Sequence, residues 1–195
     1  MNLLMVRHGE IPSNINKVYA GRSAEKLTSK GVTQAEEVAE KIKPYNLDEL
    51  YSSPIARALQ TAEIITGRIG KDILIDDSFR ELEMGPWEGM YESDISRLYP
   101  YEWHIWNTKP AELMLPGRET LDDLLKRVLT GVQDIYDKAK NRNVVIVTHV
   151  AIIRVLLLWH EKKSLNFYKS IHIPNAEIFE IKICERPGST VLPLN

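Results

Sequence analysis

Two apolar segments of the chain each end in a histidine. Arg7 and His8 follow residues 2–6, and His149 follows residues 143–147. Both segments are predicted to be buried strands of an α/β sheet, and such sheets bind ligands beyond the carboxyl ends of their strands. Two histidines at two such ends can therefore face one pocket. A neutral imidazole can act as a nucleophile near neutral pH, and a guanidinium group binds phosphoryl oxygens well.

A second arginine and a carboxylate extend this set. Arg57 lies in the expected first turn of the helix after the second strand, where free N–H groups and the helix dipole attract anions. The ligand that suits these groups is a phosphoryl group. Cleavage of a phosphate ester also requires a proton donor beside the bridging oxygen. Glu81 and Glu83, in the loop after the third strand, are both candidates for that donor.

Alternating strands and helices must position these residues. Strands are predicted at 2–6, 47–51, 73–75, 143–147 and 177–183, with one more at 188–194. Helices are predicted at 32–42, from the capping Ser53 and Pro54 to residue 67, from Thr120 onward, and at 150–159. Residues 11–30 and 76–91 are expected to be irregular. The pattern predicts an α/β fold, a three-layer α/β/α sandwich with a mostly parallel central sheet. We expect one domain over 1–195, with a small, cap-like helical insertion at about 90–117.

Composition narrows the classes of function. The chain has 195 residues, a formal net charge of −2 and 27% charged residues, so no general affinity for nucleic acid or for a membrane is expected. Cys184 is the only cysteine, which excludes an intrachain disulfide and favours a cytoplasmic location. The apolar start is too short for a signal peptide, and residues 150–159 are too few to span a bilayer.

Five blocks in order along the chain resemble the histidine phosphatase superfamily, in its phosphoglycerate-mutase-like branch. They are VRHGE at 6–10, LTSKGVTQAEEVA at 27–39, YSSPIARALQTAEII at 51–65, FRELEMGPWEG at 79–89 and VVIVTHVAIIR at 144–154. The resemblance covers roughly residues 1 to 183. It implies that His8 is a phosphorylated nucleophile and that Arg7, Arg57 and a protonated His149 clamp the phosphoryl group.

The resemblance also implies roles for other positions. Asn14 matches a position that helps to bind phosphoryl oxygens, and Glu81, four residues before Gly85, matches the family's acid more closely than Glu83 does. The family usually has a small residue where this chain has Val150, whose backbone N–H can still face phosphate. We also expect the His8 nitrogen that faces away from phosphorus to donate to a backbone carbonyl, with Gly9 permitting the tight turn.

The expected function is hydrolysis of a phosphomonoester, a small phosphorylated metabolite, through a phosphohistidine intermediate. No metal and no cofactor are expected, because the arginines supply positive charge. Three narrower activities stay open: an α-ribazole-5′-phosphate phosphatase, a phosphoserine phosphatase and a cofactor-dependent phosphoglycerate mutase. The short stretch between Glu81 and Thr120 favours a phosphatase. A non-catalytic phosphate-binding module is disfavoured, because every expected catalytic residue type is present.

Three further questions stay open at this point. Arg118 can reach the substrate or lie in solvent. Trp103 and Trp106 can pack under the insertion or stack on a planar base, and packing is favoured. The chain can be a monomer or a homodimer.

Overall fold

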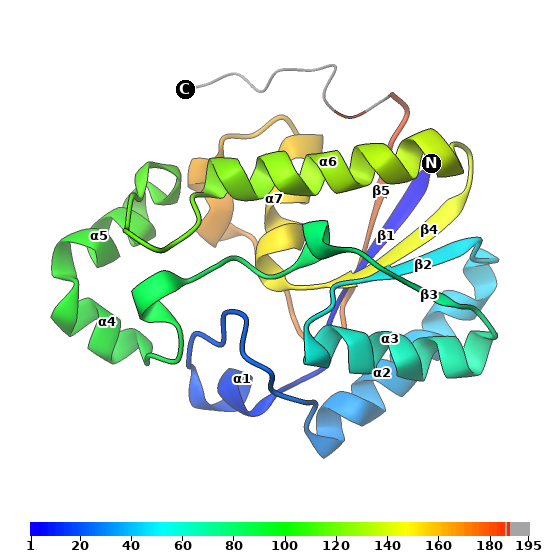
Figure 1. The fold of residues 1–195 in the computed structure, drawn as a ribbon, viewed down its shortest axis with the longest axis horizontal. Helices are drawn as coiled ribbons and strands as arrows, with labels where there is room; N and C mark the ends of the chain where they lie inside the picture. Colours follow the sequence, from blue (N-terminus) through cyan, green and yellow to red (C-terminus); the bar gives the residue numbers. More distant parts are fainter. Residues whose placement is uncertain (186, 188–195) are drawn as a thin grey trace.

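A central sheet organises the molecule (Figure 1). The computed structural model describes residues 1–185 and 187. The strand order is β3-β2-β4-β1-β5. The first four strands run parallel, and β5 runs antiparallel to β1. The expected mostly parallel sheet is therefore confirmed. The strands are β1 (Asn2–Arg7), β2 (Glu49–Ser52), β3 (Ile73–Ile75), β4 (Asn143–Thr148) and β5 (Ile178–Lys182).

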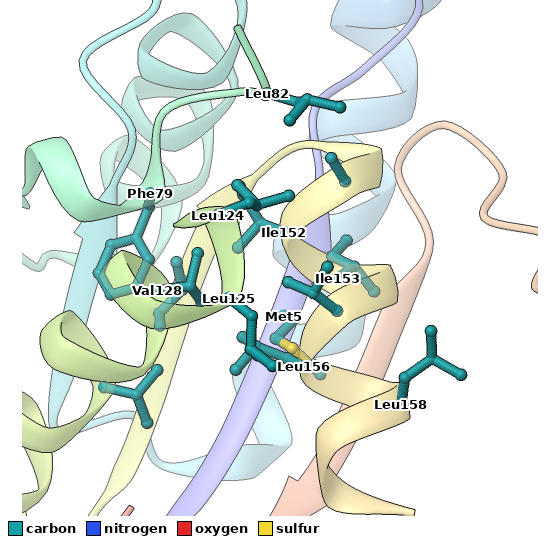
Figure 2. Packing of buried hydrophobic residues seen from close by; sticks show 14 of the residues in the cluster. Met5, Phe79, Leu82, Leu124, Leu125, Val128, Ile152, Ile153, Leu156 and Leu158 are labelled. Carbon is teal, nitrogen blue, oxygen red and sulfur yellow. The ribbon is translucent and has the colours of Figure 1, made fainter. Parts of the chain in front are cut away.

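Both faces of the sheet are covered at its central strands, as strand β1 illustrates. Its side chains alternate, so Leu3 and Met5 join one apolar cluster while Leu4 and Val6 join another. The first cluster lies against α6 (Leu121–Ala139) and α7 (Val150–His160), and Figure 2 shows its packing. The second lies against α2 (Ser29–Ile42) and α3 (Ala56–Ile69). These are the three expected layers.

Two helices begin at a side-chain N-cap: α6 at Thr120, as predicted, and α2 at Thr28, ahead of the predicted start at residue 32. The Thr120 hydroxyl accepts a hydrogen bond from the Asp123 N–H, and the Thr28 hydroxyl accepts one from the Gly31 N–H. These two N-caps begin α6 and α2, because each satisfies a backbone donor that the first turn leaves free.

The predicted insertion is helical. It contains α4 (Glu92–Leu98), α5 (Pro100–Thr108) and the 3₁₀ turn η4 (Pro110–Glu112), and in Figure 1 it lies at one side of the sheet. Its Trp106 packs against Tyr168 of η5 (Leu165–Ser170), with ring centroids 5.1 Å apart. The remaining short turns are η1 (Lys43–Tyr45), η2 (Asp77–Phe79) and η3 (Gly85–Trp87).

Two local expectations are wrong. Residues 11–30 contain a short helix, α1 (Pro12–Asn16), because Pro12 begins a turn in which the Asn14 side chain accepts the Ile11 N–H. Ser53 does not cap α3. Its backbone N–H still bonds to Val147 of β4, so the chain leaves the sheet later and the helix begins at Ala56. The strand expected at 188–194 lies outside the described residues.

None of the helices in the described part of the chain combines the length and the apolar character that a membrane span requires.

Gly9 is required by a close approach rather than by the expected tight turn. Its φ is not among the positive values, but a Cβ added at Gly9 would lie 2.4 Å from the Gly31 carbonyl oxygen. The loop that carries His8 therefore rests directly on the start of α2.

Gly9→Ala should lower the free energy of unfolding by about 1–3 kcal/mol, because backbone must move to admit the new methyl group. Gly67→Ala is the matched control. Nothing lies within 4 Å of a Cβ added to this residue of α3, so the change should stabilise by about 0.5–1 kcal/mol. Urea unfolding measures both, and equal stabilities of Gly9→Ala and wild type would contradict the close approach.

Candidate active site

The pairing of β1 with β4 brings the two histidines together. Arg7 is in register with Thr148, so His8 and His149 directly follow the ends of neighbouring parallel strands. The His8 N–H donates to the Thr148 carbonyl at 2.9 Å, and the two imidazole centroids are 5.3 Å apart. The convergence expected from the sequence is confirmed.

His8 is oriented as a neutral nucleophile would be. Its Nδ1 lies 2.7 Å from the Gly9 carbonyl oxygen, to which it donates, as expected. Its Nε2 accepts a hydrogen bond from Arg57 Nε at 3.1 Å and therefore carries the lone pair. Burial first, and then Arg57 and Arg7, hold the pKa of His8 well below its ordinary value. The ring is therefore neutral at neutral pH.

Two arginines surround the ring. Arg57 is 1% exposed, in the first turn of α3, and its terminal nitrogens donate to the Gly21 and Ser23 carbonyls. Arg7 donates from Nη1 to the Ile173 carbonyl, and its Nε has no partner in the described part of the chain. Burial lowers the pKa of Arg7 to about 10, so both guanidinium groups stay charged at neutral pH.

His149 is neutral as well. It is fully buried, and its Nε2 lies 2.8 Å from the Ser53 hydroxyl oxygen. Burial, followed by Arg57 and His8, holds the pKa of His149 well below its ordinary value. The protonated form of His149 that the sequence analysis expects is therefore disfavoured, because the ring is buried beside the cationic arginines.

Asn14 and Val150 also lie at the pocket. The Asn14 Oδ1 accepts from the Ile11 N–H and from Asn175 Nδ2, which leaves its own Nδ2 to donate to an anion. Val150 is the first residue of α7 and lines the same cavity. The structure thus brings both residues to the position that the sequence predicts.

Glu81 lines the same cavity as His8 and the two arginines. Its Oε1 accepts from the backbone N–H groups of Leu82 and Ala151, which leaves Oε2 as the oxygen for a proton. Burial raises the pKa of Glu81, and Arg57 opposes this shift. The Glu83 carboxylate instead pairs with Arg22 at 2.9 Å and is half exposed. The geometry therefore favours Glu81 over Glu83.

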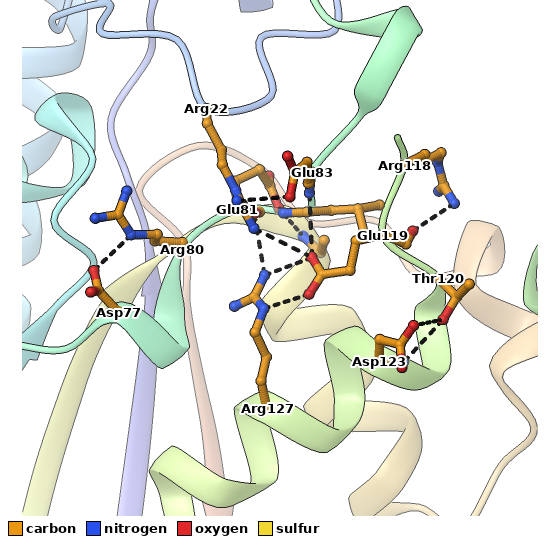
Figure 3. A network of polar contacts seen from close by, with 12 residues as sticks. Arg22, Asp77, Arg80, Glu81, Glu83, Arg118, Glu119, Thr120, Asp123 and Arg127 are labelled. Carbon is orange, nitrogen blue, oxygen red and sulfur yellow. Dashed lines mark hydrogen bonds and ion pairs between the residues drawn. The ribbon is translucent and has the colours of Figure 1, made fainter. Parts of the chain in front are cut away.

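The Glu81 loop is held from below by helix α6 (Figure 3). Arg127 of α6 donates to the Ser78 and Glu81 carbonyls and pairs with Glu119 at 2.6 Å. Arg22 donates to the same Glu81 carbonyl from the opposite side. The backbone of the candidate acid is thus fixed by two arginines, although its carboxylate pairs with neither.

The cavity above these residues encloses about 320 Å³. Its lining also includes residues that the sequence interpretation missed: Tyr19, Glu92, Arg154, Tyr168 and Lys169. Arg154 interrupts an otherwise apolar helix, a signal that could have found it. Lys169 lies in an irregular turn that carries no such signal. Its Nζ donates to Asn107 Oδ1 and lies 5.0 Å from the centroid of the Trp103 ring.

Arg118 neither lines the cavity nor lies in solvent. It is 7% exposed, and its guanidinium carbon lies 4.3 Å from the Trp106 ring centroid. Trp106 lines the cavity but is 2% exposed, while Trp103 packs edge-on against Trp87. The rings of Trp103 and Trp106 therefore pack under the insertion, which is the interpretation that the sequence favours.

Known proteins resemble this chain over most of its length. The family model described as Histidine phosphatase superfamily (branch 1) matches residues 3–193. Phosphoserine phosphatase 1 of Hydrogenobacter thermophilus is 28% identical over 195 residues, which cover 100% of this chain and 92% of that protein. Phosphoglycerate mutase-like protein 4 of Arabidopsis thaliana is 34% identical over 157 residues, covering 79% of this chain and 68% of that protein.

The solved structure of Bacillus stearothermophilus YhfR superposes with a TM-score of 0.90 at 26% identity, covering 98% of this chain and 96% of that one. The family match spans nearly the whole chain and includes every residue of the site described above. The chain belongs to the histidine phosphatase superfamily, branch 1, and is a phosphatase.

Proposed function

We propose that this phosphatase hydrolyses a small phosphomonoester through a phosphohistidine on His8. The observation that carries the proposal is the His8 tautomer, with Nδ1 bound to Gly9 and the Nε2 lone pair facing Arg57. A nucleophile requires that lone pair, and a phosphoryl group requires the cations beside it.

The first chemical step transfers the phosphoryl group to His8. The Nε2 lone pair attacks phosphorus, the ester P–O bond breaks, and its electron pair goes to the leaving oxygen, which takes a proton from Glu81. The Arg57 N–H that holds the lone pair must move to a phosphoryl oxygen as the N–P bond forms. Arg7, Asn14 and His149 hold the equatorial oxygens, where the transition state concentrates its charge.

The second step regenerates the enzyme. The Glu81 carboxylate takes a proton from water, the resulting hydroxide attacks phosphorus, and the P–N bond returns its electron pair to Nε2. The raised pKa of Glu81 suits it for the first role, since an acid must hold its proton near the working pH.

We assign the enzyme to the cytoplasm because its one cysteine gives no disulfide.

The charged residues that line the cavity favour a substrate that carries charges besides its phosphoryl group. Arg154 and Lys169 line it without an ion pair to any carboxylate in the described residues. Glu92 lines the same cavity and accepts a hydrogen bond from the Tyr19 hydroxyl at 3.2 Å. These groups complement a carboxylate and an ammonium group, so phosphoserine is the substrate that we favour.

α-Ribazole phosphate and a mutase reaction fit the cavity less well. A planar base such as that of α-ribazole phosphate would need an open aromatic face, but Arg118 and Tyr168 pack against Trp106. A mutase reaction would need water to be excluded while phosphohistidine persists, and the wall between Glu81 and Thr120 consists of short helices and turns only.

His8→Ala should reduce turnover of p-nitrophenyl phosphate by at least about 10⁴-fold, because no other described group provides the nucleophile. Rapid alkaline quenching with ³²P-labelled phosphoserine should trap acid-labile label on wild type and none on His8→Ala. Near wild-type activity of the variant would end this mechanism.

Glu81→Gln should lower kcat by about 10²–10⁴-fold, because the leaving oxygen loses its proton donor. In wild type, kcat/KM should fall as pH rises through the raised pKa of Glu81, since only its protonated form is the acid. Glu83→Gln, at the exposed neighbouring carboxylate, is the matched control and should change kcat by less than about threefold. The opposite ranking would assign the acid to Glu83.

Lys169→Met should lower kcat/KM for phosphoserine by at least about tenfold, since a hydrogen bond to a charged group contributes about 1.5–3 kcal/mol. The methionine stem keeps the apolar contacts with the indole rings, and p-nitrophenyl phosphate turnover should not change. Lys163→Met, at an exposed lysine paired with Glu161, is the control. An equal loss for both substrates would exclude a role in selectivity.

A further inference from the structure

The two nitrogens of His149 have unequal surroundings. Nε2 meets the Ser53 hydroxyl at 2.8 Å, whereas Nδ1 is buried without a partner in the described part of the chain. A buried polar atom without a partner is costly, and this one belongs to a ring whose centroid lies 5.3 Å from that of His8, which lines the cavity. Such an atom beside a binding site indicates a missing ligand. The two nitrogens lie on different sides of the ring, and Ser53 contacts only Nε2.

The contacts of Ser53 determine the direction of that hydrogen bond. Ser53 is fully buried, and its Oγ already accepts the Ile55 N–H at 3.3 Å. The hydroxyl hydrogen then requires an acceptor, and His149 Nε2 is the acceptor that the described contacts offer. With the Ser53 O–H donating to Nε2, the hydrogen of the neutral imidazole lies on Nδ1.

We propose that Ser53 is a positioning residue that keeps the hydrogen of neutral His149 on Nδ1, from which it is donated to a phosphoryl oxygen. That the Nδ1–H group contacts a phosphoryl oxygen rests on the proposed function, whereas the assignment of the tautomer does not. The opposite tautomer would turn a lone pair toward the anion and repel it.

With the hydrogen on Nδ1, a buried histidine can bind an anion without carrying a charge. Arg7 and Arg57 already supply positive charge next to the ring, and a third cation in the same dry volume would be costly. A neutral N–H donor avoids that cost and still contributes directional stabilisation of the transition state. Selection of the tautomer is then the contribution of the Ser53 hydroxyl to catalysis.

Long-range ¹H–¹⁵N NMR of the full chain, labelled with ¹⁵N-histidine, distinguishes the tautomers directly. His149→Gln identifies the signals. In wild type we expect an N–H signal at Nδ1 and a lone-pair signal at Nε2, and in Ser53→Ala we expect the Nε2–H form or a mixture. Ser52→Ala is the matched control: this neighbouring hydroxyl is equally buried but donates to the Ser53 carbonyl, so its loss should leave the tautomer unchanged.

The same variants give a functional readout. Ser53→Ala should lower kcat for p-nitrophenyl phosphate by at least about tenfold, weaken orthovanadate inhibition by a similar factor and change KM by less than about threefold. Ser52→Ala should change none of these values. Thermal melting confirms that both variants fold.

Either of two results would overturn the proposal. One is an Nε2–H or doubly protonated His149 in wild type. The other is a Ser53→Ala protein that keeps the wild-type tautomer or the wild-type kcat. A wild-type protein without phosphatase activity would instead refute the proposed function, because the NMR signals report the tautomer whether or not the enzyme turns over.

Discussion

The in-register pairing of β1 with β4 is the constraint on which the site depends. It places Arg7 opposite Thr148, so His8 and His149, which directly follow these residues, meet with their imidazole centroids 5.3 Å apart. A slip of one residue would turn every side chain of β1 to the other face and disrupt both apolar clusters. The packing of Leu3 and Met5 on one face, and of Leu4 and Val6 on the other, therefore also fixes the position of the reactive ring.

The second constraint is electrostatic. The cavity gathers guanidinium groups whose positive charge no carboxylate neutralises in an ion pair among the described residues, and it keeps both imidazoles neutral by burial and by that same charge. The backbone holds these cations: carbonyls of Gly21, Ser23 and Ile173 accept their N–H groups. Such a site is organised before an anion arrives, so little reorganisation is needed when charge develops in the transition state.

Much of this arrangement was predictable from the sequence, for identifiable reasons. Strands β1 and β4 are apolar runs that end abruptly in His8 and His149, and both the periodicity and the family blocks point to one sheet edge. Ser53 shows where prediction from the sequence fails. Its type and the following proline favour a helix cap, but a tertiary bond to β4 and a contact with His149 determine its position. Lys169 was missed because neither its turn nor its neighbours carry a periodic pattern.

The wall of the cavity is made by segments that are remote in sequence from the reactive ring. Lys169 of η5 reaches across to Asn107 of α5, and both elements stand outside the three layers that hold the histidines. Substitutions of the polar residues in these two segments can therefore change the lining of the cavity while the strands that carry the histidines keep their sequence. The same catalytic residues can in this way be combined with different substrate-binding residues.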